Sequence, residues 1–141
     1  MPKVKLPQVL LAFDFGMKKI GVAVGQSITE SATPLTELVA RDGIPDWGKI
    51  LELIETWKAD ALVVGLPYNV DGSQQEVTLA AKKFGNRLQD RFQKTVYFVD
   101  ERFTTVEAKA QLRHSSQAID RYAAKLILEA WFREQNNEQK N

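Results

Sequence analysis

Residues 10–16, LLAFDFG, place one carboxylate, that of Asp14, between two phenylalanines in an otherwise apolar run. Moving an unpaired ionised carboxylate out of water costs several kcal/mol or more, so a strand that only had to pack would not include one. Asp14 therefore either meets a partner elsewhere in the fold or holds a ligand. The run itself predicts a β-strand over residues 8–15.

The segments that follow this run predict an antiparallel meander. IGVAVG, residues 20–25, is a second apolar strand, and the short connection GMKK leaves room only for a hairpin. ATPLTELV, residues 32–39, is a third and more weakly marked strand. The turn and cap residues of RDGIPDW then end this part of the chain.

Helices and strands alternate in the rest of the chain. A first helix is predicted from Asp46, which is placed as its N-cap, and its apolar positions are Trp47, Ile50, Leu51, Ile54 and Trp57. ALVVGL (61–66) and TVYFVD (95–100) are predicted strands, separated by a helix with Val77, Ala81, Phe84 and Leu88 on one stripe. Strands joined by crossover helices run parallel, so we expect an α/β fold with a mixed five-stranded sheet flanked by helices.

Two further helices are predicted near the C-terminus. Thr104 and Glu107 form a capping-box pattern that opens a short helix to about residue 112. The final helix is expected near residues 119–133, with Ile119, Tyr122, Ala123, Leu126, Ile127, Ala130 and Trp131 at helical spacing. The polar residues 134–141 and residues 1–6 are expected to be flexible tails.

Length and composition indicate one domain, residues 1–141, of an ordinary soluble protein. The chain is 44% hydrophobic and 26% charged, with a net charge of +1 that neither announces nor excludes a nucleic-acid partner. No stretch approaches the roughly 18 apolar residues of a membrane span, and the N-terminal apolar run is too short for a signal peptide. We expect a cytoplasmic protein.

The residue types present limit the chemistry to oxygen ligands. There is no cysteine, which excludes disulfides, thiolate zinc sites and cysteine nucleophiles, and there is one histidine, His114, expected to be a loop residue. Any metal site must then be built from carboxylates and similar groups, which favour hard cations such as Mg²⁺ or Mn²⁺.

Acidic residues at three places in the sequence suit such a site. Asp14 is inside the first strand, Asp100 and Glu101 stand at the end of the last strand, and Asp120 begins the final helix, where alanines allow close packing. Alone, Asp120 could be a helix cap and Glu101 a solvated turn residue, and the residues do not choose between Asp100 and Glu101. Together, the acids would repel one another unless a cation neutralised them. Two such cations can activate water for phosphodiester hydrolysis.

Four stretches of the chain resemble one known family. LAFDFGMKKIGVAVG, VVGLPYNVDGS, VDERFTTVEA and DRYAAKLILEAWF are similar, in the same order, to motifs of the YqgF family, also called RuvX. Its members are described as pre-16S rRNA nucleases and as Holliday-junction-resolvase-like proteins with an RNase H-like fold. The resemblance covers nearly the whole chain. It implies a metal-dependent nuclease for the 5′ end of pre-16S rRNA, acting in ribosome biogenesis on structured or precursor RNA, as a monomer or homodimer.

The same resemblance implies roles for individual residues. It makes Asp14, Glu101 and Asp120 the catalytic and metal-binding acids, and so chooses Glu101 over Asp100. Two residues depart from the family pattern, Met17 after DFG and Arg121 after Asp120, and neither removes a carboxylate. Residues expected to contact nucleic acid are Lys18, Lys19, Asn69, Arg102 and Arg121.

Three other functions remain open at this stage. An ATPase or phosphotransferase of the actin type has a similar first motif, but at 141 residues the chain supplies one of the two lobes that such a cleft needs. A non-catalytic nucleic-acid or transcription-associated module would gain nothing from clustered acids. A DNA junction resolvase would require two sites and therefore a dimer.

Overall fold

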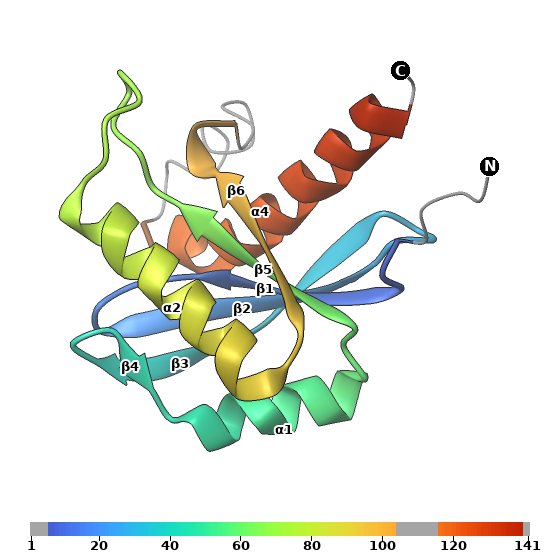
Figure 1. Ribbon diagram of the computed structural model, residues 1–141, viewed down its shortest axis with the longest axis horizontal. Helices are drawn as coiled ribbons and strands as arrows, with labels where there is room; N and C mark the ends of the chain where they lie inside the picture. Colours follow the sequence, from blue (N-terminus) through green and yellow to red (C-terminus); the bar gives the residue numbers. More distant parts are fainter. Residues whose placement is uncertain (1–5, 104–115, 140–141) are drawn as a thin grey trace.

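The fold is a six-stranded sheet with helices on both faces (Figure 1). The computed structural model describes residues 6–103 and 116–139, with the backbone alone for residues 103, 116–121 and 138–139. The strands are β1 (Val9–Asp14), β2 (Lys19–Gln26), β3 (Ser31–Arg41), β4 (Ile44–Pro45), β5 (Ala61–Leu66) and β6 (Thr95–Asp100). The helices are α1 (Trp47–Trp57), α2 (Glu76–Phe92), the 3-10 turn η1 (Glu101–Phe103) and α4 (Ser116–Gln139).

The predicted mixed topology is confirmed. The strand order is β4-β3-β2-β1-β5-β6, in which β1, β2 and β3 pair antiparallel while β5 pairs parallel with both β1 and β6. The three parallel strands therefore end at the same side of the sheet, at Asp14, Leu66 and Asp100. We call this side the carboxyl end of the sheet, and the opposite side its amino end.

The sheet has six strands, whereas the sequence predicted five. The additional strand, β4, is only two residues long and pairs with β3 at Ala40↔Pro45 and Arg41↔Ile44. It lies in the segment that was predicted to be turn and cap residues. Gly43, at φ +79°, closes this small hairpin, and so short a strand has no periodicity for a sequence pattern to detect.

Helix α4 runs six residues beyond its predicted end, to Gln139, so the segment expected to be an unfolded polar tail is helical over most of its length. The buried residues Trp131 and Phe132 fix the preceding turns on the sheet. Glutamate, glutamine and lysine then prolong a helix at little cost once it is nucleated.

The two faces of the sheet carry separate apolar layers. Leu11 and Phe13 of β1 pack under α1 and α2, in a cluster that includes Ile50 and Phe84. The alternate β1 residues, Leu10 and Ala12, face α4 with Ile127 and Trp131, in a second cluster. Because successive side chains of a strand point to opposite faces of the sheet, each β1 side chain belongs to one of the two layers.

The first helix begins as predicted, because the Asp46 side chain accepts a hydrogen bond from the Gly48 amide at 2.9 Å. Its apolar stripe was predicted too wide. Ile50 and Ile54 are buried, but Leu51 and Trp57 are 43% and 42% exposed. The predicted capping box at Thr104 and Glu107, the short helix after it and His114 lie outside the described residues.

Candidate metal centre and nucleic-acid interface

Asp14 is the last residue of β1 and lies half-buried at the carboxyl end of the sheet. Strand alternation puts it on the same face as Leu10 and Ala12, which pack toward α4. In the parallel pair, Phe13 lies opposite Val64. The next residue of β5, Gly65, is therefore the neighbour of Asp14 across the sheet.

Glu101 lies over this same glycine. A β-carbon at position 65 would be 2.8 Å from Oε1 of Glu101 and 2.5 Å from Cδ1 of Ile127 on α4. Both contacts are closer than a real β-carbon tolerates, so the glycine leaves the space that the carboxylate and the helix residue occupy. Asp14 at the end of β1 and Glu101 directly after β6 thus come from either side of β5 to one face of the sheet.

The backbone of Asp120 lies in the second turn of α4. Ile127 is seven residues further on, or about two turns and about 10 Å along the axis, so the two positions share a side of the helix. Figure 1 shows the first turns of α4 on the side of the sheet where the arrows of β1 and β5 end. The Asp120 side chain lies outside the described residues, as does that of Arg121.

Asp100 and Glu101, which the residues alone could not separate, have different surroundings. Asp100 accepts hydrogen bonds from Nη2 of Arg102 at 2.6 Å, from its Nε at 3.1 Å and from its backbone amide at 2.9 Å. The hydrogen bonds from Arg102 hold the pKa of Asp100 below its usual value, and the same pair raises the pKa of Arg102. Asp100 therefore has an arginine as its counter-ion, while Glu101 lies by Gly65.

The donor set fits a hard cation. Among the described side chains, no three histidine, cysteine, aspartate or glutamate residues form a group that could hold a metal ion. Asp14 and Glu101 are two described carboxylates of the predicted three, and the third belongs to Asp120. Carboxylate oxygens are the donors that Mg²⁺ or Mn²⁺ prefers.

The described residues that were predicted to contact nucleic acid lie near this end of the sheet and differ in their exposure and in their ion pairs and hydrogen bonds. Lys18 is exposed in the connection after β1, and Lys19 pairs with Glu37 at 3.5 Å. The side-chain amide of Asn69 donates to Ser73 at 2.9 Å within the loop after β5. Arg102 is held by Asp100.

Two glycines that bring α4 close to the sheet were missed by the sequence analysis. Gly65, at the site, interrupts the apolar strand ALVVGL, and an isolated glycine in a strand is a signal for close approach of another group. Gly25 of β2, opposite Leu10 near the amino end of the sheet, also lets the helix approach, because a β-carbon there would lie 2.7 Å from Leu128 of α4. Glycines in the sheet, as well as alanines on the helix, bring α4 close.

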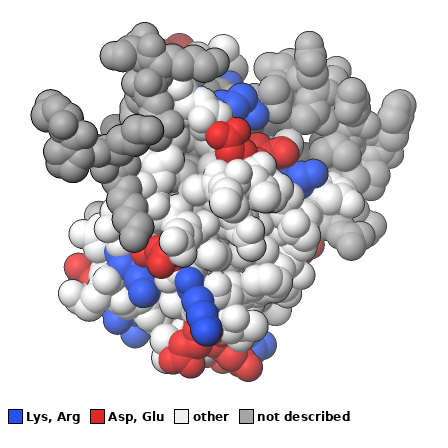
Figure 2. All heavy atoms as spheres, turned by 90° about the vertical axis from the view of Figure 1, so that its right-hand side faces the viewer, with Lys and Arg blue, Asp and Glu red and all other residues white. Residues whose placement is uncertain are grey.

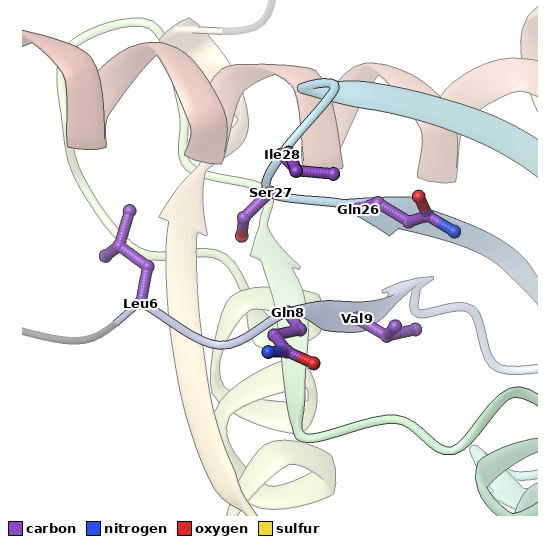
Figure 3. Close-up of a pocket in the computed structure, with 6 residues that line it drawn as sticks. All are labelled: Leu6, Gln8, Val9, Gln26, Ser27 and Ile28. Carbon is purple, nitrogen blue, oxygen red and sulfur yellow. The ribbon is translucent and has the colours of Figure 1, made fainter.

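A cavity of about 560 Å³ lies at the other end of β1, away from the acids. Figure 3 shows its lining from two segments, Leu6, Gln8 and Val9 before and in β1, and Gln26, Ser27 and Ile28 at the β2–β3 turn. None of these residues is charged.

Figure 2, which views the molecule from the right of Figure 1, shows a wide uncharged area with charged groups toward its margins. The visible described residues there form no continuous basic surface.

No helix within the described residues is long and apolar enough to cross a membrane.

Comparison with known proteins gives one consistent family. A family model described as "RuvX: Holliday junction resolvase" matches residues 8–134. A Coxiella burnetii protein is 58% identical over 135 residues, covering 92% of this chain and 96% of its own. Relatives from Nitrosococcus oceani (49% over 140 residues, 95% and 92% covered) and Aeromonas salmonicida (50% over 133 residues, 89% and 95% covered) carry the same name, "Putative pre-16S rRNA nuclease".

Two solved structures show a similar fold. Thermus thermophilus RuvC in complex with a Holliday junction substrate superposes with a TM-score of 0.58 at 15% identity, covering 91% of this chain and 96% of that one. The yeast mitochondrial Holliday junction resolvase Ydc2 gives a TM-score of 0.54 at 12% identity, covering 93% and 80%. At these identities the likeness concerns the fold.

Proposed function

The chain belongs to the RuvX family and has the RNase H-like fold that its sequence predicted, and from this premise we propose that it is a metal-dependent nuclease that processes the 5′ end of pre-16S rRNA. It is a hydrolase of phosphodiester bonds. Relatives with 49% to 58% identity over nearly the whole chain carry that nuclease name, which supports precursor rRNA as the first substrate to test. As part of the proposal, the protein acts in the cytoplasm as a monomer or homodimer.

One observation carries the chemistry: Asp14 and Glu101 come to the same face of the sheet on either side of a residue without a side chain. Carboxylate oxygens that converge on one face of a sheet are the donors that hard divalent cations prefer. We assign Asp14, Glu101 and Asp120 as the ligands of Mg²⁺ or Mn²⁺, with Asp120 supplied from α4. A cation bound there supplies an activated water and stabilises the leaving oxygen of the phosphodiester.

The description of the matching family model names a second candidate substrate. The matching family model is described as a Holliday junction resolvase, so a four-way DNA junction belongs in the same assay as precursor rRNA. Cutting a junction symmetrically needs two active sites and therefore two copies of this chain. Cleavage of the junction by a dimer, with precursor rRNA left intact, would replace the proposed substrate and keep the proposed metal site.

The deciding experiment compares wild type with Asp14→Asn. Precursor 16S rRNA, an unrelated structured RNA and a four-way DNA junction are incubated with each protein in Mg²⁺, in Mn²⁺ and in EDTA. We expect cleavage of precursor rRNA by wild type in metal alone and none by Asp14→Asn. Asp90→Asn, on the exposed face of α2, is the matched control and should cleave as wild type does. Equal cleavage by wild type and Asp14→Asn would refute the proposal.

A further inference from the structure

Tyr68, Lys82 and Arg102 form a compact group at the carboxyl end of the sheet, and we call it the Tyr68 cluster. The Nζ atom of Lys82 and the Cζ atom of Arg102 each lie 5.6 Å from the centre of the Tyr68 ring. The three residues come from the loop after β5, from α2 and from η1. Cations at this distance are attracted to the face of an aromatic ring. Two positive charges are thus gathered around one tyrosine.

The position of Arg102 is fixed from several directions. Asp100 binds its Nε and Nη2 atoms, and Nη1 lies 3.4 Å from the carbonyl oxygen of Val70. A β-carbon on Gly72, whose φ is +90°, would be 3.2 Å from Nη1. The loop after β5 is therefore shaped to admit the guanidinium group. A side chain held this firmly loses little entropy when it binds a ligand.

Lys82 and Tyr68 are also held in place. Lys82 donates to Oε1 of Gln74 at 3.3 Å, and it makes no ion pair with a carboxylate among the described residues. The Tyr68 ring is half-buried and packs on the apolar cluster under α2. The hydroxyl of Thr78 donates to the carbonyl of Pro67, beside Tyr68 in the chain. The cluster therefore has a rigid base, in which Arg102 is paired with Asp100 and lies within electrostatic reach of Asp71, while Lys82 makes no ion pair with a described carboxylate.

The Tyr68 cluster lies next to the proposed metal centre. Arg102 directly follows Glu101, and Tyr68 follows β5 three residues after Gly65. The backbone carries Glu101 to the α4 face of the sheet, whereas the Arg102 side chain turns back over the loop after β5. A nucleic-acid strand with one phosphate at the proposed metal centre would bring a neighbouring phosphate toward Arg102 and Lys82.

We propose that Lys82 and Arg102, held against Tyr68, bind a backbone phosphate of the substrate strand next to the bond that is cut. This inference rests on the proposed nuclease function and adds Tyr68 and Lys82 to the substrate site. Lys82 and Arg102 contact the phosphate, while Tyr68 and Asp100 are positioning residues that hold the two cations. Phosphate contacts of this kind set the register of a strand and carry no sequence information.

The test measures how binding depends on salt. A labelled fragment spanning the 5′ end of pre-16S rRNA is titrated by fluorescence anisotropy in EDTA, at several KCl concentrations. Each lost phosphate contact lowers the magnitude of the negative slope of log K against log [KCl] by about 0.7 to 0.9. Lys82→Gln should show that decrease, and Lys58→Gln, an exposed lysine before β5 at the amino end of the sheet, should not. An unchanged slope in Lys82→Gln would overturn the inference.

Two tyrosine variants test the positioning role. Tyr68→Phe keeps the ring that attracts both cations, so its affinity for the RNA should match wild type. Tyr68→Leu removes the ring, and we expect several-fold weaker binding and a higher KM with little change in kcat. Thermal unfolding of both variants is the check that they fold. If Tyr68→Phe weakened binding as much as Tyr68→Leu, the ring would not be the positioning element and that part of the inference would be wrong.

The outcomes separate this inference from the proposed function. If wild type cleaves the RNA but Lys82→Gln binds and cleaves as wild type does, the phosphate site is wrong and the nuclease stands. If wild type binds with the expected salt slope and Lys82→Gln lowers it, yet no metal supports cleavage, the site stands and the nuclease is wrong. If wild type neither binds nor cleaves, both are wrong.

Discussion

Glu101 occupies the space that a side chain at Gly65 would fill, with its Oε1 atom 2.8 Å from the position of the missing β-carbon. The contact joins the residue that follows β6 to β5, the strand that lies between β6 and β1, which carries Asp14. It explains why an apolar, fully buried strand contains a glycine near its end. The position of one proposed metal ligand therefore depends on a residue that has no functional group.

Gly65→Ala should disturb both the site and the fold. The new methyl group meets Glu101 and Ile127, and overpacking of this kind costs about 1 to 3 kcal/mol of unfolding free energy. Because the methyl group would displace the Glu101 carboxylate from its place over position 65, we also expect loss of metal-dependent cleavage per folded molecule. Chemical denaturation and the cleavage assay measure the two effects separately.

Gly85→Ala is the control variant, because it overpacks the core at a place where no proposed metal ligand lies. A β-carbon there would lie 2.5 Å from the ring of Phe98, as close as the nearest contact at position 65, and it touches no acid. It should lose stability and keep its cleavage rate per folded molecule. Full cleavage by folded Gly65→Ala would show that Glu101 is not held by this contact, or does not act.

Much of the fold could be predicted because its patterns are long or strongly apolar. The strands at residues 61–66 and 95–100 have the predicted bounds, and Asp14 was singled out because a charge in a buried run is costly. An isolated glycine in a strand indicates that another group comes close but not which group, so the contact between Gly65 and Glu101 could not be predicted. The ion pair between Asp100 and Arg102 could not be predicted either, because the residues "DER" are equally typical of a solvated turn. Only the direction of the backbone in the structure distinguishes the surroundings of Asp100 from those of Glu101.

Metal binding should stabilise wild type and not Asp14→Asn. A ligand at 100 times its Kd adds about 2.7 kcal/mol to the unfolding free energy. For a chain of this size, each kcal/mol raises Tm by about 2 to 4 °C or slightly more. Without metal, we expect Asp14→Asn to be as stable as wild type or more stable, because the substitution relieves repulsion between acids.

The measurement is thermal unfolding in EDTA, Mg²⁺ and Mn²⁺, with Asp90→Asn as the matched control. A metal-induced rise in Tm that is the same in Asp14→Asn and wild type would place the ion elsewhere. A marked loss of stability in Asp14→Asn in EDTA would instead make Asp14 a structural residue of β1.

Asp100→Asn should destabilise the protein at neutral pH and progressively less in acid. Arg102 holds the pKa of Asp100 below the usual value of 3.8, so the folded state favours the ionised form. The stabilisation is complete above the unfolded pKa and is lost as pH falls through the lower folded pKa. Urea denaturation of both proteins between pH 7 and pH 2 should show the difference in unfolding free energy shrinking below about pH 4. A difference that stays constant with pH would mean that the ion pair with Arg102 does not contribute.

Thr78, in the first turn of α2, is the one buried polar side chain among the described residues, and Thr78→Val tests how the loop that carries Tyr68 is held. The hydroxyl of Thr78 donates to the Pro67 carbonyl and accepts from the Gln75 amide at 3.0 Å, so it ties the start of α2 to the end of β5. Valine has nearly the same shape but leaves both backbone groups unpaired, at a cost of about 1 to 3 kcal/mol. Thr33→Val, on the exposed side of β3, should change the unfolding free energy by no more than about 0.5 kcal/mol.

Because Pro67 precedes Tyr68, Thr78→Val should also weaken RNA binding in EDTA, whereas Thr33→Val should not. Equal stabilities of the two variants would show that water replaces the lost hydroxyl, and the loop after β5 would then be held by its other contacts.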